Sequence, residues 1–251
     1  MTGNTEQRQD DTHRFLLGRH RADLTPEMRD ALAAAMSPRM VVPARKTIIR
    51  RGEEVRHSTL LVSGFLCRYM DARDGYRQLV SVQVPGDFVD LHGYPLHRLD
   101  HDVASLTEVS IITVSHDDLT ALIERFPGLS RILWFATMLD AAMHREWIFR
   151  LGRLEAVGRV AHFLCETYER LRAVGLAADG RFDFPLTQQD IGEACGLTSV
   201  HVNRTLRRLR EGGLAEMSAR EVRIGNLHAL AALGEFEPDY LYFDGGGPLK
   251  A

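Results

Sequence analysis

Residues 187–214 read TQQDIGEACGLTSVHVNRTLRRLREGGL, and this stretch predicts two helices joined by a tight turn. Thr187 and Asp190 have the spacing of a capping box, in which a hydroxyl and a carboxylate satisfy free amides at a helix start. Gly192 leaves room for a second helix to cross closely, and Gly196 stands where the chain must turn with a backbone conformation that other residues resist. The spacing is that of a helix-turn-helix.

The second predicted helix has an apolar face and a basic face. Thr198 is placed to cap its start, while Val202, Leu206 and Leu209 are expected to point inward. Ser199 to Gly212 contains four arginines and one glutamate, a local balance of +3 in a chain whose formal net charge is −3. This contrast favours a polyanion, and double-stranded DNA is the predicted partner.

The first turns of such a helix are expected to reach base edges in the major groove. Arg204 is the predicted base contact, because a guanidinium pairs in a bidentate manner with guanine, and Arg207 and Arg208 are expected to contact phosphates. The other candidate DNA contacts are Thr187, Gln188, Ser199, Val200, His201 and Asn203. The alternative is a solvated arginine face with no ligand.

A β-hairpin is predicted behind this helix, where LAEMSAREVRI alternates apolar and polar residues around Ser218 to Arg220. A hairpin in this place makes a wing. Arg220 at its tip is either a phosphate contact or a solvated turn residue.

The N-terminal part predicts a small antiparallel barrel from about Met40 to Val114. Short apolar runs are separated by turn residues, and the clearest hairpin is a two-residue reversal at Asp74-Gly75. Apolar residues then recur at helical spacing from Leu119 to Leu171, after which AADGRFDFP is expected to be a loop.

One stripe on this long helical region is too long to be buried by a small barrel alone. It is therefore predicted to form a homodimer interface, with an intramolecular core helix as the alternative. Its residues are Ile132, Ala136, Leu139, Met143, Trp147 and Leu151.

The composition is that of an ordinary globular protein of one or two domains, with 251 residues, 45% of them apolar and 26% charged. No apolar run is long enough to span a membrane, and the polar start, Met1 to Asp11, is not an export signal, so a cytoplasmic protein is expected. Cys67, Cys165 and Cys195 form no disulfide or metal motif, and no catalytic motif is present, so neither catalytic residues nor an enzyme is predicted.

Together with VSGF at 62–65, PGDF at 85–88 and RLEAVGRVAHFL at 153–164, these features resemble the Crp/Fnr superfamily of bacterial transcription regulators. The resemblance implies an α+β fold that binds palindromic promoter DNA as a homodimer. Its implied parts are a cyclic-nucleotide-binding-like antiparallel β jelly-roll barrel (13–125), a long dimerisation helix (126–152), a winged helix-turn-helix (153–235) and a C-terminal tail (236–251).

The effector region departs from the cyclic-AMP-binding members. They place a glutamate on the ribose and an Arg-Ser pair on the phosphate, whereas a rough alignment sets Leu91 and Leu99-Asp100 at those positions. The effector is therefore expected to be something other than cyclic AMP, or absent, although Arg98 keeps a cyclic nucleotide as a minority alternative. The candidate pocket residues are Gly86, Asp87, Asp90, Leu91, Arg98 and Asp100.

No cofactor is predicted. An iron-sulfur cluster needs four thiolates, and no cysteine precedes Cys67. Haem or a metal at the loop bearing His92, His97 and His101 stays an alternative, although this spacing matches no ligand motif.

A further departure lies in the second predicted helix. Many members of the superfamily have a glutamate where this sequence has Val200, which is expected to contact a thymine methyl group instead. Control is expected either through an effector that shifts the long helix or through constitutive binding. RNA polymerase is a further candidate partner, and the rival function is a small-molecule-binding module that acts on a protein.

Overall fold

The computed structural model describes residues 11–244, and they divide into two compact units. The first contains the chain up to Tyr69 and Val82–Asp140, and the second contains Met70–Ser81 and the chain from Ala141 onward. The division falls inside one continuous helix, so the sequence-based domain limits remain a proposal. The polar start, residues 1–12, and the glycine-rich end, residues 244–251, have compositions that predict loose tails, and they lie almost wholly outside the described residues.

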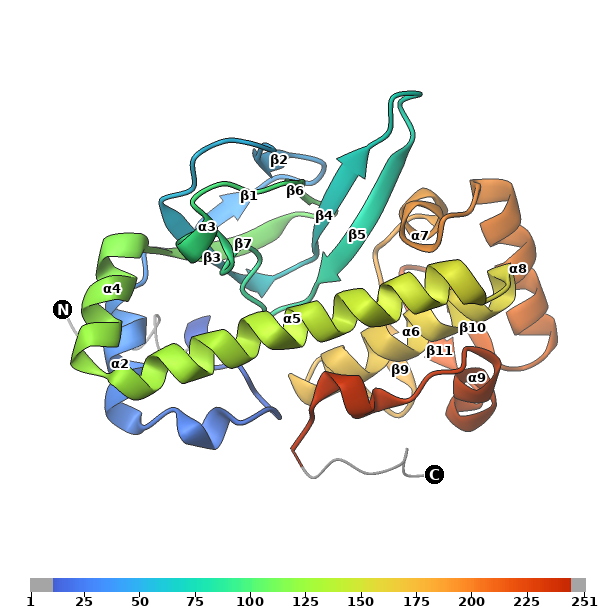
Figure 1. Ribbon diagram of the computed structural model, residues 1–251. Helices are drawn as coiled ribbons and strands as arrows, with labels where there is room; N and C mark the ends of the chain where they lie inside the picture. The colour runs from blue at the N-terminus through green and yellow to red at the C-terminus, as the bar shows by residue number, and fades with distance from the viewer. Residues whose placement is uncertain (1–10, 245–251) are drawn as a thin grey trace. The chain divides into compact units, whose positions relative to one another are not determined.

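The N-terminal part of the chain is built on two antiparallel sheets, which confirms the predicted barrel (Figure 1). Of these sheets, only the hairpin segment Met70–Ser81 is grouped with the second unit. One sheet has the order β1-β7-β3 and the other the order β2-β6-β4-β5. The strands are β1 (Met40–Val42), β2 (Thr47–Ile49), β3 (His57–Ser63), β4 (Leu66–Asp71), β5 (Arg77–Gln83), β6 (Asp102–Ser105) and β7 (Val109–Ser115).

The β4–β5 hairpin forms where Asp74-Gly75 predicts it, but its loop is longer than two residues. The strands end at Asp71 and resume at Arg77. Within the loop, the Gly75 amide donates to the Ala72 carbonyl and Gly75 has φ +84°, so the glycine closes a wider turn. The prediction of a two-residue reversal was therefore wrong in length and right in place.

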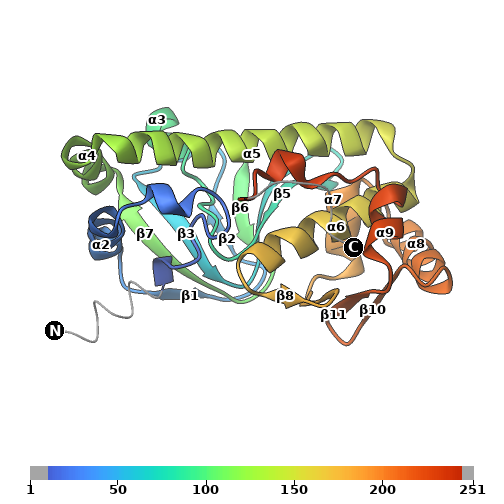
Figure 2. The same cartoon turned by 90° about the horizontal axis from the view of Figure 1, so that it is seen from below.

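Helices complete this unit, namely η1 (Arg21–Asp23), α2 (Pro26–Ala35), α3 (Gly93–Leu96) and α4 (His116–Arg125). Figure 2 shows α2 beside α4. Their apolar faces join the first half of the long helix α5 (Pro127–Arg153) in a core that includes Leu32, Leu60, Ile112 and Leu133. The β-sheet interior holds a second cluster around Leu61, Val89 and Val103.

The second unit is a winged helix-turn-helix. Its helices are α6 (Ala156–Ala173), α7 (Gln188–Cys195), α8 (Ser199–Glu211), α9 (Leu227–Leu233) and η2 (Pro238–Leu241). α6 packs against α7, α8 and α9, and its buried face carries Phe163 and Leu164. The wing is the predicted hairpin, made of β10 (Ala215–Ser218) and β11 (Glu221–Ile224).

The segment AADGRFDFP is a second hairpin rather than a loop. β8 (Ala177–Ala178) pairs with β9 (Arg181–Asp183), and β9 in turn pairs with β11, giving the sheet order β10-β11-β9-β8. Asp179 and Gly180 both have positive φ, as a two-residue hairpin turn requires. Phe182 and Phe184, two positions apart, are buried. The spacing of these two phenylalanines was visible in the sequence, but strands of two and three residues are too short for such spacing to predict a hairpin.

No helix among residues 11–244 is long and apolar enough to cross a lipid bilayer.

Candidate nucleic-acid interface

The start of α7 is fixed by the predicted capping box. The Asp190 amide donates to Thr187 Oγ1 at 3.2 Å, and the Thr187 amide donates to Asp190 Oδ2 at 2.7 Å. Asp190 is buried, so this exchange satisfies a carboxylate that would otherwise be costly in the interior. The helix therefore begins at one defined residue.

Two glycines allow the turn between α7 and α8. A Cβ at Gly192 would lie 2.5 Å from the Leu197 carbonyl oxygen, so only glycine permits this close approach. Gly196 ends α7 with φ +63° in the left-handed region. Thr198 Oγ1 then accepts from the His201 amide at 3.4 Å and caps α8. Each of these roles agrees with its prediction from the sequence.

The outer face of α8 is polar and basic. Val202 and Leu209 are buried and Leu206 is half-buried, which orients the helix. The candidate contacts on the opposite face are all exposed, namely Ser199, Val200, His201, Asn203, Arg204, Arg207 and Arg208. At about 100° per residue, Val200, Arg204, Arg207 and Arg208 lie on one side of the helix.

Three of the polar candidates make local hydrogen bonds. His201 Nδ1 lies 3.1 Å from Thr198 Oγ1, and Asn203 Nδ2 donates to Gln188 Oε1 at 3.4 Å. The second bond joins a side chain of α7 to one of α8 and orients both amides. Thr187 is exposed and Gln188 half-buried at the start of α7.

Arg220 lies at the tip of the wing. Ala219 and Arg220 have φ +47° and +67°, and both are exposed. The hairpin turn therefore holds two residues with side chains in a backbone conformation that usually selects glycine or asparagine. This turn presents the Arg220 side chain to solvent.

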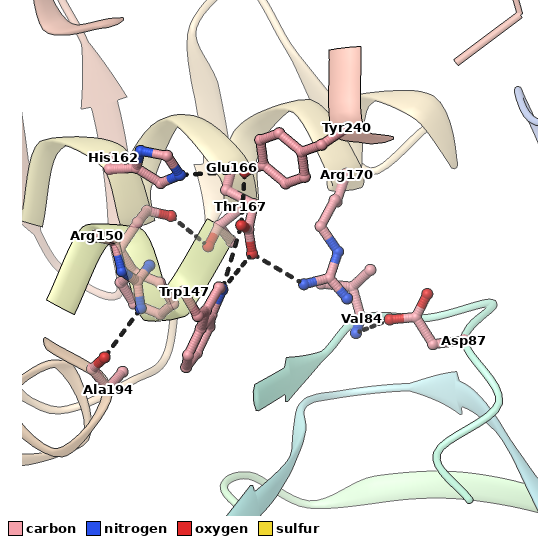
Figure 3. Close-up of polar contacts among 11 residues, drawn as sticks. Val84, Asp87, Trp147, Arg150, His162, Glu166, Thr167, Arg170, Ala194 and Tyr240 are labelled. Atoms are coloured by element: carbon pink, nitrogen blue, oxygen red, sulfur yellow. Dashed lines mark hydrogen bonds and ion pairs between the residues drawn. The ribbon is translucent and has the colours of Figure 1, made fainter. Parts of the chain in front are cut away.

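A buried polar network supports this unit, and Figure 3 shows its members. Glu166 on α6 is fully buried and accepts from Trp147 Nε1 at 3.0 and 3.2 Å, from the Tyr240 hydroxyl at 2.7 Å, and from Arg170 at 3.4 Å. Burial alone would raise the pKa of Glu166, but the charges of Arg170 and Arg150 outweigh it and the pKa lies below its usual value. The carboxylate is the ionised centre of the network.

His162 and Tyr240 extend this network to the end of the described chain. His162 Nδ1 lies 3.0 Å from the Gly234 carbonyl oxygen, and its Nε2 lies 3.2 Å from the Tyr240 hydroxyl. Burial lowers the pKa of His162 to about 4 and raises that of Tyr240. The start of the predicted C-terminal tail is thus packed, with Phe236 and Leu241 buried.

Arg150 joins α5 to the helix-turn-helix. Its guanidinium donates to the Ala194 carbonyl at 2.9 Å, near the C-terminal end of α7, and lies 4.1 Å from the centre of the Trp147 ring. A cation at a helix C-terminus is favoured by the helix dipole. The cation–π contact with the Trp147 ring offsets part of the desolvation cost of burying the guanidinium. Sequence reasoning missed Arg150, Glu166 and Tyr240, since isolated polar residues on amphipathic helices give no signal of burial.

The predicted dimer stripe is largely used within the chain. Ile132, Leu139 and Trp147 are buried and Ala136, Met143 and Leu151 half-buried. The exposed apolar side chains of α5 are instead Trp134, Met138, Ile148 and Phe149. At about 100° per residue these two sets are centred on roughly opposite faces of the helix. The burial of the predicted stripe therefore agrees with the alternative prediction, a helix whose apolar stripe packs within its own chain.

The candidate effector residues do not form one cluster of ligand-binding groups. Gly86 and Asp87 form a turn in which the Asp87 carboxylate accepts from the Val84 amide at 2.9 Å, as Figure 3 shows. Leu91 is buried in the apolar core, Arg98 is exposed, and the Asp100 side chain is 88% exposed. The resemblance assigns the phosphate-binding positions to Leu99 and Asp100, and an exposed carboxylate there does not fit the guanidinium pattern of the cyclic-AMP-binding members.

Asp90 lies inside the first unit as a structural group. It accepts from the amide and the hydroxyl of Thr59, at 2.6 and 2.8 Å. Burial raises its pKa to about 6, although these hydrogen bonds and the charge of Arg68 act in the opposite direction.

Arg68 is a buried cation of this unit, and the sequence analysis did not single it out. It is 2% exposed, donates from Nε to the Val89 carbonyl at 2.7 Å, and pairs with Asp140 of α5 at 2.5 Å. A basic residue within the apolar run LLVSGFLCRYM was the available signal.

The histidine loop does not assemble a ligand set for a metal. The His92 and His101 rings lie 5.3 Å apart, and His101 Nδ1 lies 2.7 Å from Asp100 Oδ1, while His97 is exposed. Within residues 11–244, no three or more histidine, cysteine, aspartate or glutamate side chains are grouped to hold a metal ion. Burial lowers the pKa of His92 to about 4 and also lowers that of His101, with Arg68 adding to both.

Comparison with known proteins agrees with this arrangement. A cyclic nucleotide-binding domain model matches residues 39–126, and a Crp-like helix-turn-helix domain model matches residues 158–233. A probable transcriptional activator of Rhizobium leguminosarum is 31% identical over 71% of this chain and 73% of its own length. The transcriptional activator protein FnrL of Cereibacter sphaeroides is 28% identical over 70% of this chain and 72% of its own.

A solved structure supports the same assignment over both units. FixK2 from Bradyrhizobium japonicum is similar with a TM-score of 0.71 and 26% identity, covering 78% of this chain and 96% of that one. The jelly-roll sheets, the long helix, the winged helix-turn-helix and these relatives show that the chain is a DNA-binding transcription regulator and belongs to the Crp/Fnr family.

Proposed function

We propose that the protein binds a twofold-symmetric DNA site as a homodimer, with one α8 helix in the major groove of each half-site. The observation that carries the proposal is the outer face of α8, where the exposed Val200 and three exposed arginines lie on one side of the helix. A solvated surface helix has no need of an apolar side chain that is 69% exposed, whereas a thymine methyl group gives Val200 a contact. The protein acts by binding, in the cytoplasm where its DNA lies, and not by catalysis.

The proposed contacts divide into base and phosphate contacts. Arg204 reads a guanine, while Arg207, Arg208 and the wing residue Arg220 contact phosphates. The other proposed contacts come from the start of α7 and the first turns of α8, namely Thr187, Gln188, Ser199, Val200, His201 and Asn203.

The proposed dimer forms through the exposed face of α5. Trp134 and Ile148 are 67% and 72% exposed, and Met138 and Phe149 are 48% and 41% exposed. Four large apolar side chains on one face of a single helix are costly in water, and a second copy of the same helix buries them in a symmetric contact. This face replaces the one predicted from the sequence. We further propose that the DNA-bound dimer contacts RNA polymerase.

The test is selection of bound duplexes from a random pool, followed by competition binding. The wild type is expected to enrich a palindrome. Arg204→Ala is expected to weaken binding to it by about 1–3 kcal/mol and to relax the preference at one base pair per half-site.

Arg208→Ala is the matched control. It is expected to weaken binding to specific and random duplexes alike and to reduce the salt slope by about one unit. If Arg204→Ala lowers affinity equally for the selected and the random duplex, Arg204 is not a base contact. If no palindrome is enriched, the proposed function is wrong.

A further inference from the structure

An ion pair inside the first unit joins the sheet to the long helix. Arg68 Nη1 of β4 contacts Asp140 Oδ2 of α5 at 2.5 Å. Their side chains are 2% and 21% exposed, so water screens the pair little. The other side of the guanidinium is held by the Val89 carbonyl, at 2.7 Å from Nε.

The surroundings of Arg68 are built for this one cation. Asp90 is buried nearby with both carboxylate oxygens engaged by Thr59, so its charge acts on Arg68 without a direct bond. Burial lowers the pKa of His92 and of His101, and the nearby charge of Arg68 acts in the same direction on both. Asp140 is thus the carboxylate that pairs directly with the guanidinium.

The position of the pair along α5 gives it a consequence beyond stability. The N-terminal part of this helix is held to the first unit by apolar packing of Leu129, Ile132 and Leu133. Asp140 lies about two turns further on, at the last residue of the first unit. Beyond it the same unbroken helix continues into the DNA-binding unit.

We propose that the Arg68–Asp140 pair is an internal latch that holds α5 in its DNA-binding position without an effector. The inference rests on the proposed function and concerns its control. The interior of the sheet supplies its own cation and the helix supplies its own anion, so no bound phosphate is needed to connect the two. This explains how the unit can work although its nucleotide-binding positions carry Leu91, Leu99 and Asp100.

The first test is Asp140→Asn, which keeps the shape of the side chain and removes its charge. The affinity of the ligand-free protein for the selected palindrome is expected to fall at least about fivefold, the lower end of ordinary coupling between sites. Hydrogen exchange is expected to rise in α5 near residue 140 and to stay unchanged in β3 and β7. Asp140→Glu restores the charge and is expected to recover most of the affinity.

The matched control is Glu54→Gln, which removes the exposed carboxylate that pairs with Arg56 at 3.2 Å in the same unit. It is expected to leave DNA affinity unchanged. Should Asp140→Asn fail to fold because it leaves the buried Arg68 without its paired carboxylate, the double variant Arg68→Gln with Asp140→Asn takes its place, since it removes both charges of the pair. The same loss of affinity is expected from it.

Two results would overturn the latch. One is a folded Asp140→Asn protein, or the double variant in its place, that binds the palindrome as tightly as the wild type. The other is a wild type whose affinity for the palindrome rises on addition of cyclic AMP or cyclic GMP. Both leave the proposed function standing, because it fails only if the wild type selects no palindrome.

Discussion

Val200 is an apolar side chain on a basic surface, and its exposure gives it a testable role in base recognition. We expect Val200→Glu to change the preference at one base pair of each half-site from thymine to cytosine, because a carboxylate accepts from the cytosine amino group and repels the thymine oxygen. Selection from a random pool with the variant measures this change. As a control, thermal unfolding of the variant is measured. Its melting temperature should be nearly that of the wild type, because residue 200 is exposed. An unchanged selected sequence would place Val200 away from the bases.

His162 gives the DNA-binding unit a dependence on pH. Its pKa in the folded chain is about 4 and its ordinary value is 6.5. A depressed pKa means that the neutral ring contributes stability above pH 6.5, and this contribution is lost as the pH falls towards 4. The full contribution is about 3 kcal/mol, from 1.36 kcal/mol per pKa unit.

We therefore expect the unfolding free energy of the wild type to approach that of His162→Gln as the pH falls from 7 to 4. Denaturant unfolding at several pH values measures the difference. His228→Gln removes an exposed histidine from the same unit and is the matched control. A difference between wild type and His162→Gln that stays constant with pH would show that the ring does not titrate as described.

Among the elements, the contact between α7 and the turn before α8 depends most on one residue. In Gly192→Ala the new methyl group would meet the Leu197 carbonyl, which is backbone and cannot rotate away. We expect a loss of about 1–3 kcal/mol in stability from overpacking, more than alanine gains from its higher helix propensity. The melting temperature and the affinity for DNA are both expected to fall.

Gly128→Ala in α5 is the matched control. Its nearest neighbour is the terminal methyl group of Met28, 3.2 Å away, which can move. We expect no loss of stability there. If Gly192→Ala is as stable as Gly128→Ala, the close approach of α7 to the turn is not required.

The elements also show what the sequence can and cannot predict. The helix-turn-helix was predicted down to its caps, since Thr187, Asp190, Gly196 and Thr198 act through neighbours within three or four residues. The face of α5 that is buried was predicted as a dimer interface, because periodicity shows that a stripe is apolar but not what covers it. Arg68 and Asp140 are 72 residues apart, and no local pattern relates them.

For the whole molecule, the exposed face of α5 determines whether two copies associate. We expect Ile148→Glu to make the protein monomeric at micromolar concentration, because it would bury a charge against an apolar partner face. Light scattering measures the mass, and binding to full and half palindromes measures the consequence. The variant is expected to bind the full site no better than a half-site.

Leu96→Glu is the control, since Leu96 is 63% exposed on the first unit and lies outside α5. It is expected to stay dimeric. A dimeric Ile148→Glu protein would assign the dimer contact to another surface.

The three cysteines are all buried, and none is in a disulfide. Burial raises the pKa of Cys195 to about 11 and that of Cys165 further, so both thiols stay protonated, and thus unreactive, at neutral pH. Cys67 is buried as well, so we expect the folded protein to need no reducing agent during handling. Because the three thiols react with an alkylating reagent only when they become exposed, their labelling rates would measure how often each half of the chain opens.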